Sequence, residues 1–590
     1  MKCCLKRVLG TLACGLALIA GLSGCKSSPE GGPEGIGKRE ALTITGFNNL
    51  INEEFIEAFC REYPEVNIEL ISYAGTNGSG LARHMLEHGD IPDIYISTQN
   101  FSRESQEKYL LDLSNYDFVN NYTTALLDSM DINGGIYLLP SGYQLTGIYY
   151  NKTILEENGW EVPGSFQELA ALSEKIEAAG YRTMGHGMSL DGYPFNYFFN
   201  IGNTMYFSTP RGTGWKEDFP KGETAAAGNE ELKAAAEYFQ KWVEHGFITD
   251  NDTSVEQFYQ GECIFYLCLG LSDYTYTRED GKTFEFGTIP WLSEDGSNNM
   301  LTRTVSRYMG ISRTLSEKGK EQKLEDALKL MRYISTPEGQ KVLMASTGQY
   351  MTSLNEGTLP EDSPYQEIAS CVSAGRTVPL VYVGWEQLLI PLSQNIRSMI
   401  RGELDADGLL ETFDRTAADL RNGVSEEVYA KAVRTLTLEE TARLVAAAEG
   451  RAAGADCALI SLNRYHGDGL CNRYGLGWYI YEGNIDRDVV NMIRPRAASI
   501  CVLELTGAQI RAMRDGGFDL DGNGNPYPYL LFVKDGLELD DSTVYRLAVS
   551  ADELTEEMRA GSEQTGHSPT DAIIAYLREL ETVSGTVPWK

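Results

Sequence analysis

Two histidines and an aspartate have the spacing of a metal site. His84 and His88 are four residues apart in a helical pattern, so they share a face of the expected helix, and Asp90 follows. The alternative is an exposed helical face, because the histidines flank the apolar pair Met85 and Leu86. The chain has six histidines and no HExxH or H-x-H pattern, so metal-assisted hydrolysis lacks a ligand set. We predict no metal centre and no cofactor.

An oxygen-rich loop lies at residues 519–525, with the sequence DLDGNGN. Carboxylate and amide oxygens alternate there around a glycine, as they do in an EF-hand loop. Position twelve of such a loop would be Leu530 rather than glutamate, and an ordinary Asn-Gly turn explains the same residues. Calcium binding at this loop stays open.

The cysteines do not point to a zinc cluster or to a full disulfide framework. After Cys25 seven remain, an odd number without CxxC spacing. They are Cys60, Cys263, Cys268, Cys371, Cys457, Cys471 and Cys501. We expect most of them to be buried small apolar side chains, and their pairing stays open.

The N-terminus has the pattern of an export signal. Lys2, Lys6 and Arg7 precede an apolar run over residues 8–22, which is short for a membrane span. The segment ends in Leu-Ser-Gly-Cys25 and resembles a bacterial lipobox, in which the peptide is cut before a cysteine that then carries lipid. We therefore predict a signal peptide over 1–24, and a lipidated Cys25 with a Gly/Pro/Ser-rich tether over 25–40.

The charge balance excludes nucleic acid as a partner. The 590 residues include 50 Lys and Arg against 84 Asp and Glu, a net charge of −34 that becomes −37 without the signal. Phosphate backbones need clustered basic charge. Aromatic residues make up 10% of the chain, with 33 Tyr. An acidic, aromatic-rich and exported chain is suited to sugar chemistry outside the cell.

Apolar patterns from residue 41 onward predict a helix-covered parallel sheet. Short apolar runs alternate with segments of helical period, which indicates β-α-β-α-β order. The expected elements are strands 41–47, 66–73 and 93–97, with helices 49–62 and 80–88. Ligands bind at the carboxyl ends of such strands, here near Asn48, 73–75 and 98–100.

Five segments in the first two thirds of the chain form an ordered set of motifs. They are GDIPDIY at 89–95, GIYLLP at 135–140, YYNK to QEL at 149–169, FYQGEC at 258–263 and STPEGQ at 335–340. Together they resemble the family 1 extracellular solute-binding proteins, the receptors of ABC sugar importers, and the resemblance covers about residues 41–425. Glu262 replaces the basic residue usual in that family.

The resemblance implies an α/β fold with two lobes and a hinge, closing over a ligand. By analogy the first lobe holds about 41–140 and 306–345, and the second about 142–304 and 375–425. The implied function is capture of a carbohydrate, specifically an oligosaccharide, for an ABC permease in the membrane. The implied protein is a monomer and not an enzyme.

Sugar binding needs flat rings for pyranose faces and polar groups for hydroxyls. We expect the ligand to contact residues where the chain of such a fold passes near the space between the lobes. The candidate rings are Tyr143, Tyr193, Phe195, Trp291, Tyr308 and Trp385. The candidate polar partners are Asn48, Gln99, Gln144, Asp191 and Arg307. A core or surface role is the alternative for each ring taken alone.

Four segments in the last part of the chain form a second ordered set of motifs, at 454–463, 482–495, 502–511 and 543–550. They resemble the C-terminal domain of 5′-nucleotidases over about residues 432–590, and we expect this part of the chain to be α+β. Catalysis in that family belongs to a preceding dimetal domain, whose Asp-x-His, Asn-His-Asp and His-x-His motifs this sequence lacks. We therefore predict a binding or interaction module. The alternative function is a surface protein that binds or hydrolyses nucleotides or nucleosides through this domain.

Overall fold

The computed structural model describes residues 40–590 apart from several short segments. Those segments are 46–52, 72–77, 99–101, 272, 306, 345–350, 356–365, 381–383, 386, 423–427, 462–474, 495–498, 517–528 and 552–553. Cys25, Asn48, Gln99 and the loop 519–525 therefore lie outside the described residues.

The first lobe is built around a five-stranded sheet of order β2-β1-β3-β14-β6. Its strands are β1 (Leu42–Thr45), β2 (Ile68–Ile71), β3 (Ile94–Ser97), β6 (Leu139–Pro140) and β14 (Tyr308–Ile311). The first three are parallel, and β14 returns from more than two hundred residues later to pair antiparallel with β3 and β6. All four residues of β3 are buried, as expected for a strand covered on both faces.

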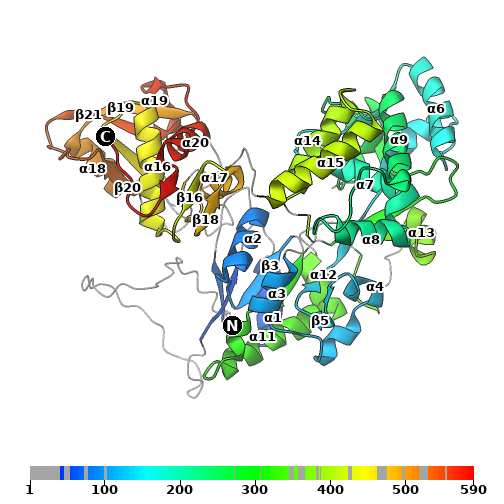
Figure 1. Ribbon diagram of the computed structural model, residues 1–590, viewed down its shortest axis with the longest axis horizontal. Coiled ribbons are helices and arrows are strands. Elements are labelled where there is room, and N and C mark those ends of the chain that lie inside the picture. The colour runs from blue at the N-terminus through cyan, green and yellow to red at the C-terminus, as the bar shows by residue number, and fades with distance from the viewer. Residues whose placement is uncertain are drawn as a thin grey trace.

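Helices cover both faces of this sheet. They are α1 (Glu53–Glu62), α2 (Gly78–His88), α3 (Arg103–Tyr109), α4 (Thr124–Leu127), α11 (Glu321–Ile334) and α12 (Pro337–Met344). The prediction of an α/β fold with two lobes is confirmed (Figure 1).

The second lobe has its own five-stranded sheet, β11-β12-β8-β10-β9. The strands are β8 (Ile148–Asn151), β9 (Arg182–His186), β10 (Cys263–Leu267), β11 (Thr275–Thr277) and β12 (Thr283–Ile289). Its helices are α5 (Lys152–Glu157), α6 (Phe166–Ala178), α7 (Tyr193–Gly202), α8 (Pro210–Asp218), α9 (Glu230–Glu244), α10 (Val255–Tyr259), α14 (Leu389–Ile400) and α15 (Ala406–Arg421). Asn151, Ser165 and Asn229 cap helices here by accepting backbone N–H bonds.

A three-stranded sheet of order β15-β13-β7 joins the lobes. Strand β7 (Tyr143–Thr146) leads from β6 to β8, β13 (Leu301–Val305) leads from β12 back to β14, and β15 (Thr377–Pro379) belongs to the third crossing. Because the chain passes three times between the lobes in hydrogen-bonded strands, these strands form the hinge.

The C-terminal domain, residues 428–590, contains two sheets, β20-β17-β21-β19-β22 and β18-β16-β23. The strands are β16 (Ala430–Ala432), β17 (Cys457–Ser461), β18 (Gly483–Ile485), β19 (Ile500–Thr506), β20 (Tyr529–Val533), β21 (Val544–Ser550), β22 (Glu563–Gln564) and β23 (Thr582–Val583). The helices are α16 (Leu438–Ala452), α17 (Arg487–Ile493), α18 (Gly507–Gly516), α19 (Glu556–Ala560) and α20 (Pro569–Leu580). Gly450 of α16 lets the buried Trp589 approach, since a Cβ there would lie 1.9 Å from the indole.

Candidate ligand-binding site

Tyr143 and Gln144 stand at the start of hinge strand β7. Tyr143 lies opposite Val305 of β13 and exchanges two backbone hydrogen bonds with Met351, of 2.8 and 2.7 Å. Gln144 is half-buried and reaches the second lobe, because a Cβ atom on Gly270 would lie 2.3 Å from its Nε2. The hinge backbone therefore holds both residues between the two lobes.

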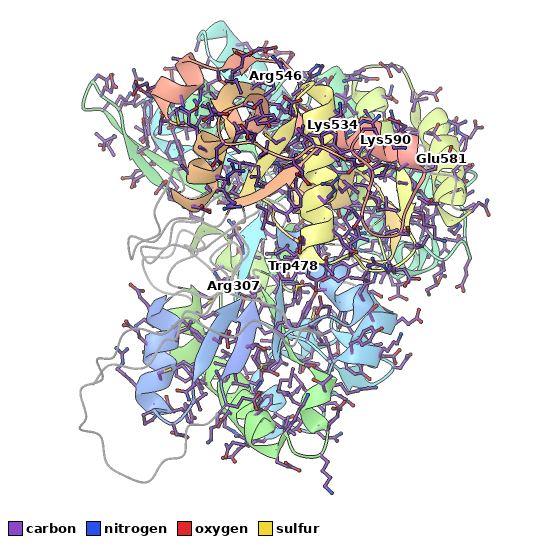
Figure 2. The ribbon with its side chains drawn as sticks, turned by 90° about the vertical axis from the view of Figure 1, so that its left-hand side faces the viewer. Arg307, Trp478, Lys534, Arg546, Glu581 and Lys590 are labelled. Carbon is purple, nitrogen blue, oxygen red and sulfur yellow. The ribbon has the colours of Figure 1, made fainter. Side chains whose placement is uncertain are left out.

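Arg307 and Tyr308 lie where the chain returns to the first lobe. Arg307 is 1% exposed, donates from Nη1 to the Leu343 carbonyl at 2.7 Å, and its own carbonyl accepts from Ser141 N at 2.8 Å. It thus ties two hinge crossings to α12, at the end of the first lobe's sheet that faces the rest of the chain (Figure 2). Tyr308 begins β14 opposite Ser97 and keeps part of its surface exposed.

Arg303 is a functional candidate that sequence reasoning missed. It is half-buried on β13, and its Nε is buried without a hydrogen-bond partner among the described residues. Burial raises the pKa of the Tyr143 and Tyr308 phenols while the charge of Arg303 lowers it, which places the guanidinium near both rings. Its only sequence signal is a basic residue inside a short apolar strand. Guanidinium donors beside two phenols can bind hydroxyl or carboxylate oxygens.

Asp191 and Tyr193 lie on the second lobe, after the end of β9. Asp191 has an exposed side chain, and its carbonyl accepts a hydrogen bond from Ser393 Oγ. Tyr193 begins α7, is half-buried and stacks on Tyr197 with ring centroids 5.7 Å apart. The absence of a side chain at Gly187 leaves room for the Tyr193 ring, because a Cβ atom at residue 187 would lie 3.1 Å from that ring. Tyr193 therefore retains an exposed part of its ring.

Phe195, Trp291 and Trp385 lie instead in the core of the second lobe. All three are 0% exposed. The indole of Trp385 is enclosed by the rings of Phe195, Phe199, Trp215 and Phe219, with centroids 5.2–5.8 Å away. Its Nε1 donates to the Lys216 carbonyl at 2.9 Å. In this conformation the three rings have no free face for a sugar, and aromatic packing explains their burial.

Replacing Lys216 with Met should raise the free energy of unfolding at pH 7 by about 1–3 kcal/mol. Lys216 is 8% exposed, and burial lowers the pKa of its amine from 10.5 to about 8. The unfolded chain therefore binds more protons between these two pKa values, so the wild type gains stability as the pH rises through that window. Urea unfolding at pH 7 and pH 10 should show the variant's advantage shrinking. An equal advantage at both pH values would contradict this assignment.

The spacing of His84, His88 and Asp90 suggests a metal site, but in the structure these residues have a different role. Among the described residues no group of three His, Cys, Asp or Glu side chains could hold a metal. The alternative of an exposed helical face is wrong for His84, whose side chain is 12% exposed, and is confirmed for His88, which is exposed. These residues instead contact the C-terminal domain.

The family profile described as bacterial extracellular solute-binding protein matches residues 54–366, more than half of the chain. The chain belongs to this family. Members are binding proteins rather than enzymes. In the described part of this solute-binding protein, no helix has the length and apolar character needed to cross a membrane.

Two curated relatives share part of the solute-binding protein's sequence. The multiple sugar-binding protein of Streptococcus mutans is 29% identical over 168 residues, covering 26% of this chain and 40% of that protein. An uncharacterized ABC transporter extracellular-binding protein of Pyrococcus horikoshii is 28% identical over 127 residues, or 21% of this chain and 30% of that protein. The chain thus matches less than half the length of these relatives.

Two solved structures share the fold. A family 1 extracellular solute-binding protein from Bifidobacterium longum subsp. infantis has a TM-score of 0.52 at 15% identity, over 65% of this chain and 100% of the other. A putative binding protein from Bacillus subtilis in an open conformation has a TM-score of 0.51 at 13% identity, over 65% of this chain and 98% of the other. At these identities the likeness concerns the fold alone.

Proposed function

We propose that this solute-binding protein captures an oligosaccharide between its lobes and delivers it to an ABC importer. The observation that carries the proposal is the set of partly exposed polar and aromatic residues at the hinge and on the second lobe, namely Gln144, Tyr193, Arg303 and Tyr308, with the buried Tyr143 beside them on the hinge strand. Family membership and the partial similarity to a protein named for sugar binding support it.

Closure of the second lobe toward the first would bring Tyr193 toward the hinge residues. Rings can then cover the apolar faces of a pyranose, while Gln144 and Arg303 take its hydroxyls. Exclusion of water strengthens each of those hydrogen bonds. Asn48, Gln99, Asp191 and Arg307 remain proposed contributors, with Arg307 acting through the hinge backbone that it holds.

We further propose that Cys25 carries lipid and that residues 25–40 tether a monomer to the outer face of the membrane. The pattern of basic, apolar and small residues before Cys25 supports this proposal. Mass spectrometry of the mature protein should find an N-terminal diacylated Cys25. An unmodified chain that still contains residues 1–24 would contradict it.

Replacing Tyr308 with Ala should weaken oligosaccharide binding about tenfold. The reason is that the variant removes a partly exposed ring beside Arg303 at the hinge. Thermal shift and calorimetry on residues 26–590 with raffinose, maltotriose and chitotriose would measure the affinity. Tyr181→Ala is the control, because Tyr181 precedes β9 at the strand end away from Tyr193.

Two results would contradict the proposal. One is stabilisation by none of a broad panel of glycans together with clear stabilisation by another solute class. The other is release of phosphate from AMP with added divalent metal, which would favour the nucleotide-hydrolysing alternative. The likeness of residues 432–590 to the 5′-nucleotidase C-terminal domain stays a prediction.

A further inference from the structure

One face of α2 in the first lobe is covered by the C-terminal domain. Leu81 and Leu86 of α2 belong to the same buried apolar cluster as Leu476 and Ile480, whereas the second lobe's core forms a separate cluster. Trp478 is 8% exposed and lies where the C-terminal domain meets the first lobe (Figure 2). The two bodies therefore share a continuous core.

Asp90 fixes the position of two tyrosines from the C-terminal domain. Its Oδ2 accepts hydrogen bonds from Tyr479 OH and, at 2.8 Å, from Tyr481 OH. The Trp478 indole donates to Tyr481 OH at 3.0 Å. Burial, and then the Asp90 charge, raise the pKa of both phenols, so they stay protonated donors. Charged acceptors make such bonds stronger than neutral ones.

His88, the last residue of α2, contacts residues 481–482 of the C-terminal domain. Its ring stacks on Tyr481 with centroids 4.5 Å apart and an interplanar angle of 14°. Nε2 lies 2.9 Å from the Glu482 carbonyl, and Nδ1 lies 2.8 Å from the carbonyl of His84 on its own helix. The imidazole therefore connects the two bodies by both a ring contact and a hydrogen bond.

An ion pair completes the contact between α2 and α17. Arg83 Nη2 lies 2.5 Å from Asp488 Oδ2, and His84 Nε2 lies 3.7 Å from the same oxygen. The Arg83 side chain is 14% exposed, so water screens this pair less than a pair on the open surface. Apolar, aromatic, hydrogen-bonded and ionic contacts thus all act across one helix face.

We infer that the C-terminal domain is docked permanently on the first lobe and that lobe closure moves the second lobe against this combined body. The chain order makes this unexpected, because the domain follows α15 of the second lobe after residues 423–427 only. Domains joined by small polar interfaces move freely, whereas a large apolar interface holds them. The α2 face is then unavailable to a membrane partner. This inference goes beyond the proposed function and does not depend on the ligand.

Spin-label distances in the ligand-free protein test the inference. Labels at Glu104→Cys and Glu557→Cys span the first lobe and the C-terminal domain, and labels at Glu104→Cys and Glu237→Cys span the two lobes. All three positions are exposed. We expect the first distance distribution to be narrow and the second at least about twofold wider, since hinged lobes exchange between open and closed states. Equal widths would overturn the inference. Serine at Cys371 and Cys471 prevents labelling of those residues.

A second variant tests whether the contacts of His88 and Asp90 hold the C-terminal domain on the first lobe. The double change His88→Ala and Asp90→Ala should widen the 104–557 distribution and leave the 104–237 distribution unchanged. Asp117→Ala is the control, because Asp117 is an exposed first-lobe carboxylate paired with Arg332. Circular dichroism of each variant establishes that the lobes remain folded. A 104–557 distribution as narrow as in the wild type would overturn the assignment.

Discussion

Replacing Glu449 with Ala should destabilise the C-terminal domain by about 3–5 kcal/mol. Glu449 of α16 pairs with Arg494, which follows α17, at 3.0 Å, and both side chains are 0% exposed. Burial raises the pKa of the Glu449 carboxyl, and the Arg494 charge opposes that shift. The variant leaves a guanidinium in the core without this carboxylate, which is the costly way to break a buried ion pair.

Urea unfolding followed by the fluorescence of Trp478 and Trp589 would measure this loss. Glu579→Ala is the matched control, because Glu579 pairs with Arg451 at the surface, where the carboxylate is 62% exposed. Such a pair contributes about 0–1 kcal/mol. Replacing both Glu449 and Arg494 with apolar residues should recover much of the stability. Equal losses for Glu449→Ala and Glu579→Ala would contradict the role of the buried pair.

Replacing Trp385 with Ala should destabilise the second lobe by about 3–5 kcal/mol, because it leaves a cavity in an enclosed aromatic cluster. The indole contacts four rings and is 0% exposed. Denaturant unfolding should therefore show a lower midpoint, with the loss confined to the transition of the second lobe. Sugar affinity of the remaining folded protein should change less than with Tyr308→Ala.

Trp160→Ala is the control for Trp385. Trp160 is a half-buried residue of the same lobe and contacts Tyr181 edge to face, so its removal opens no enclosed cavity. We expect a clearly smaller loss of stability. A Trp385→Ala protein with wild-type stability and abolished sugar binding would show that the indole leaves the core to contact ligand.

The local elements follow closely from the sequence. The predicted strand 93–97 and helix 80–88 correspond to β3 (Ile94–Ser97) and α2 (Gly78–His88). Periodicity in apolar residues reports which side of a strand or helix is buried, and alternation of the two kinds of element indicates a parallel covered sheet. The α/β fold could therefore be derived before any coordinates.

The sequence does not predict which distant segments pack against each face of a helix or strand. The pattern around Met85 and Leu86 predicts an amphipathic helix, but not that His88 of α2 stacks on Tyr481 from almost four hundred residues later. Likewise an aromatic residue near the hinge satisfies the same sequence criterion whether it is enclosed, like Trp385, or partly exposed, like Tyr193. Arg303 had no sequence signal beyond its charge.

The sequence by itself determined the classes of element, their order and the acidic character of the chain. Only the tertiary structure decided which aromatic rings remain exposed, that the Arg303 side chain lies at the hinge, and that the C-terminal domain packs on the first lobe. The physical reason is that periodicity is a local property of consecutive residues. Burial of a particular side chain depends on contacts between segments distant in the chain, and those contacts form only when the elements pack.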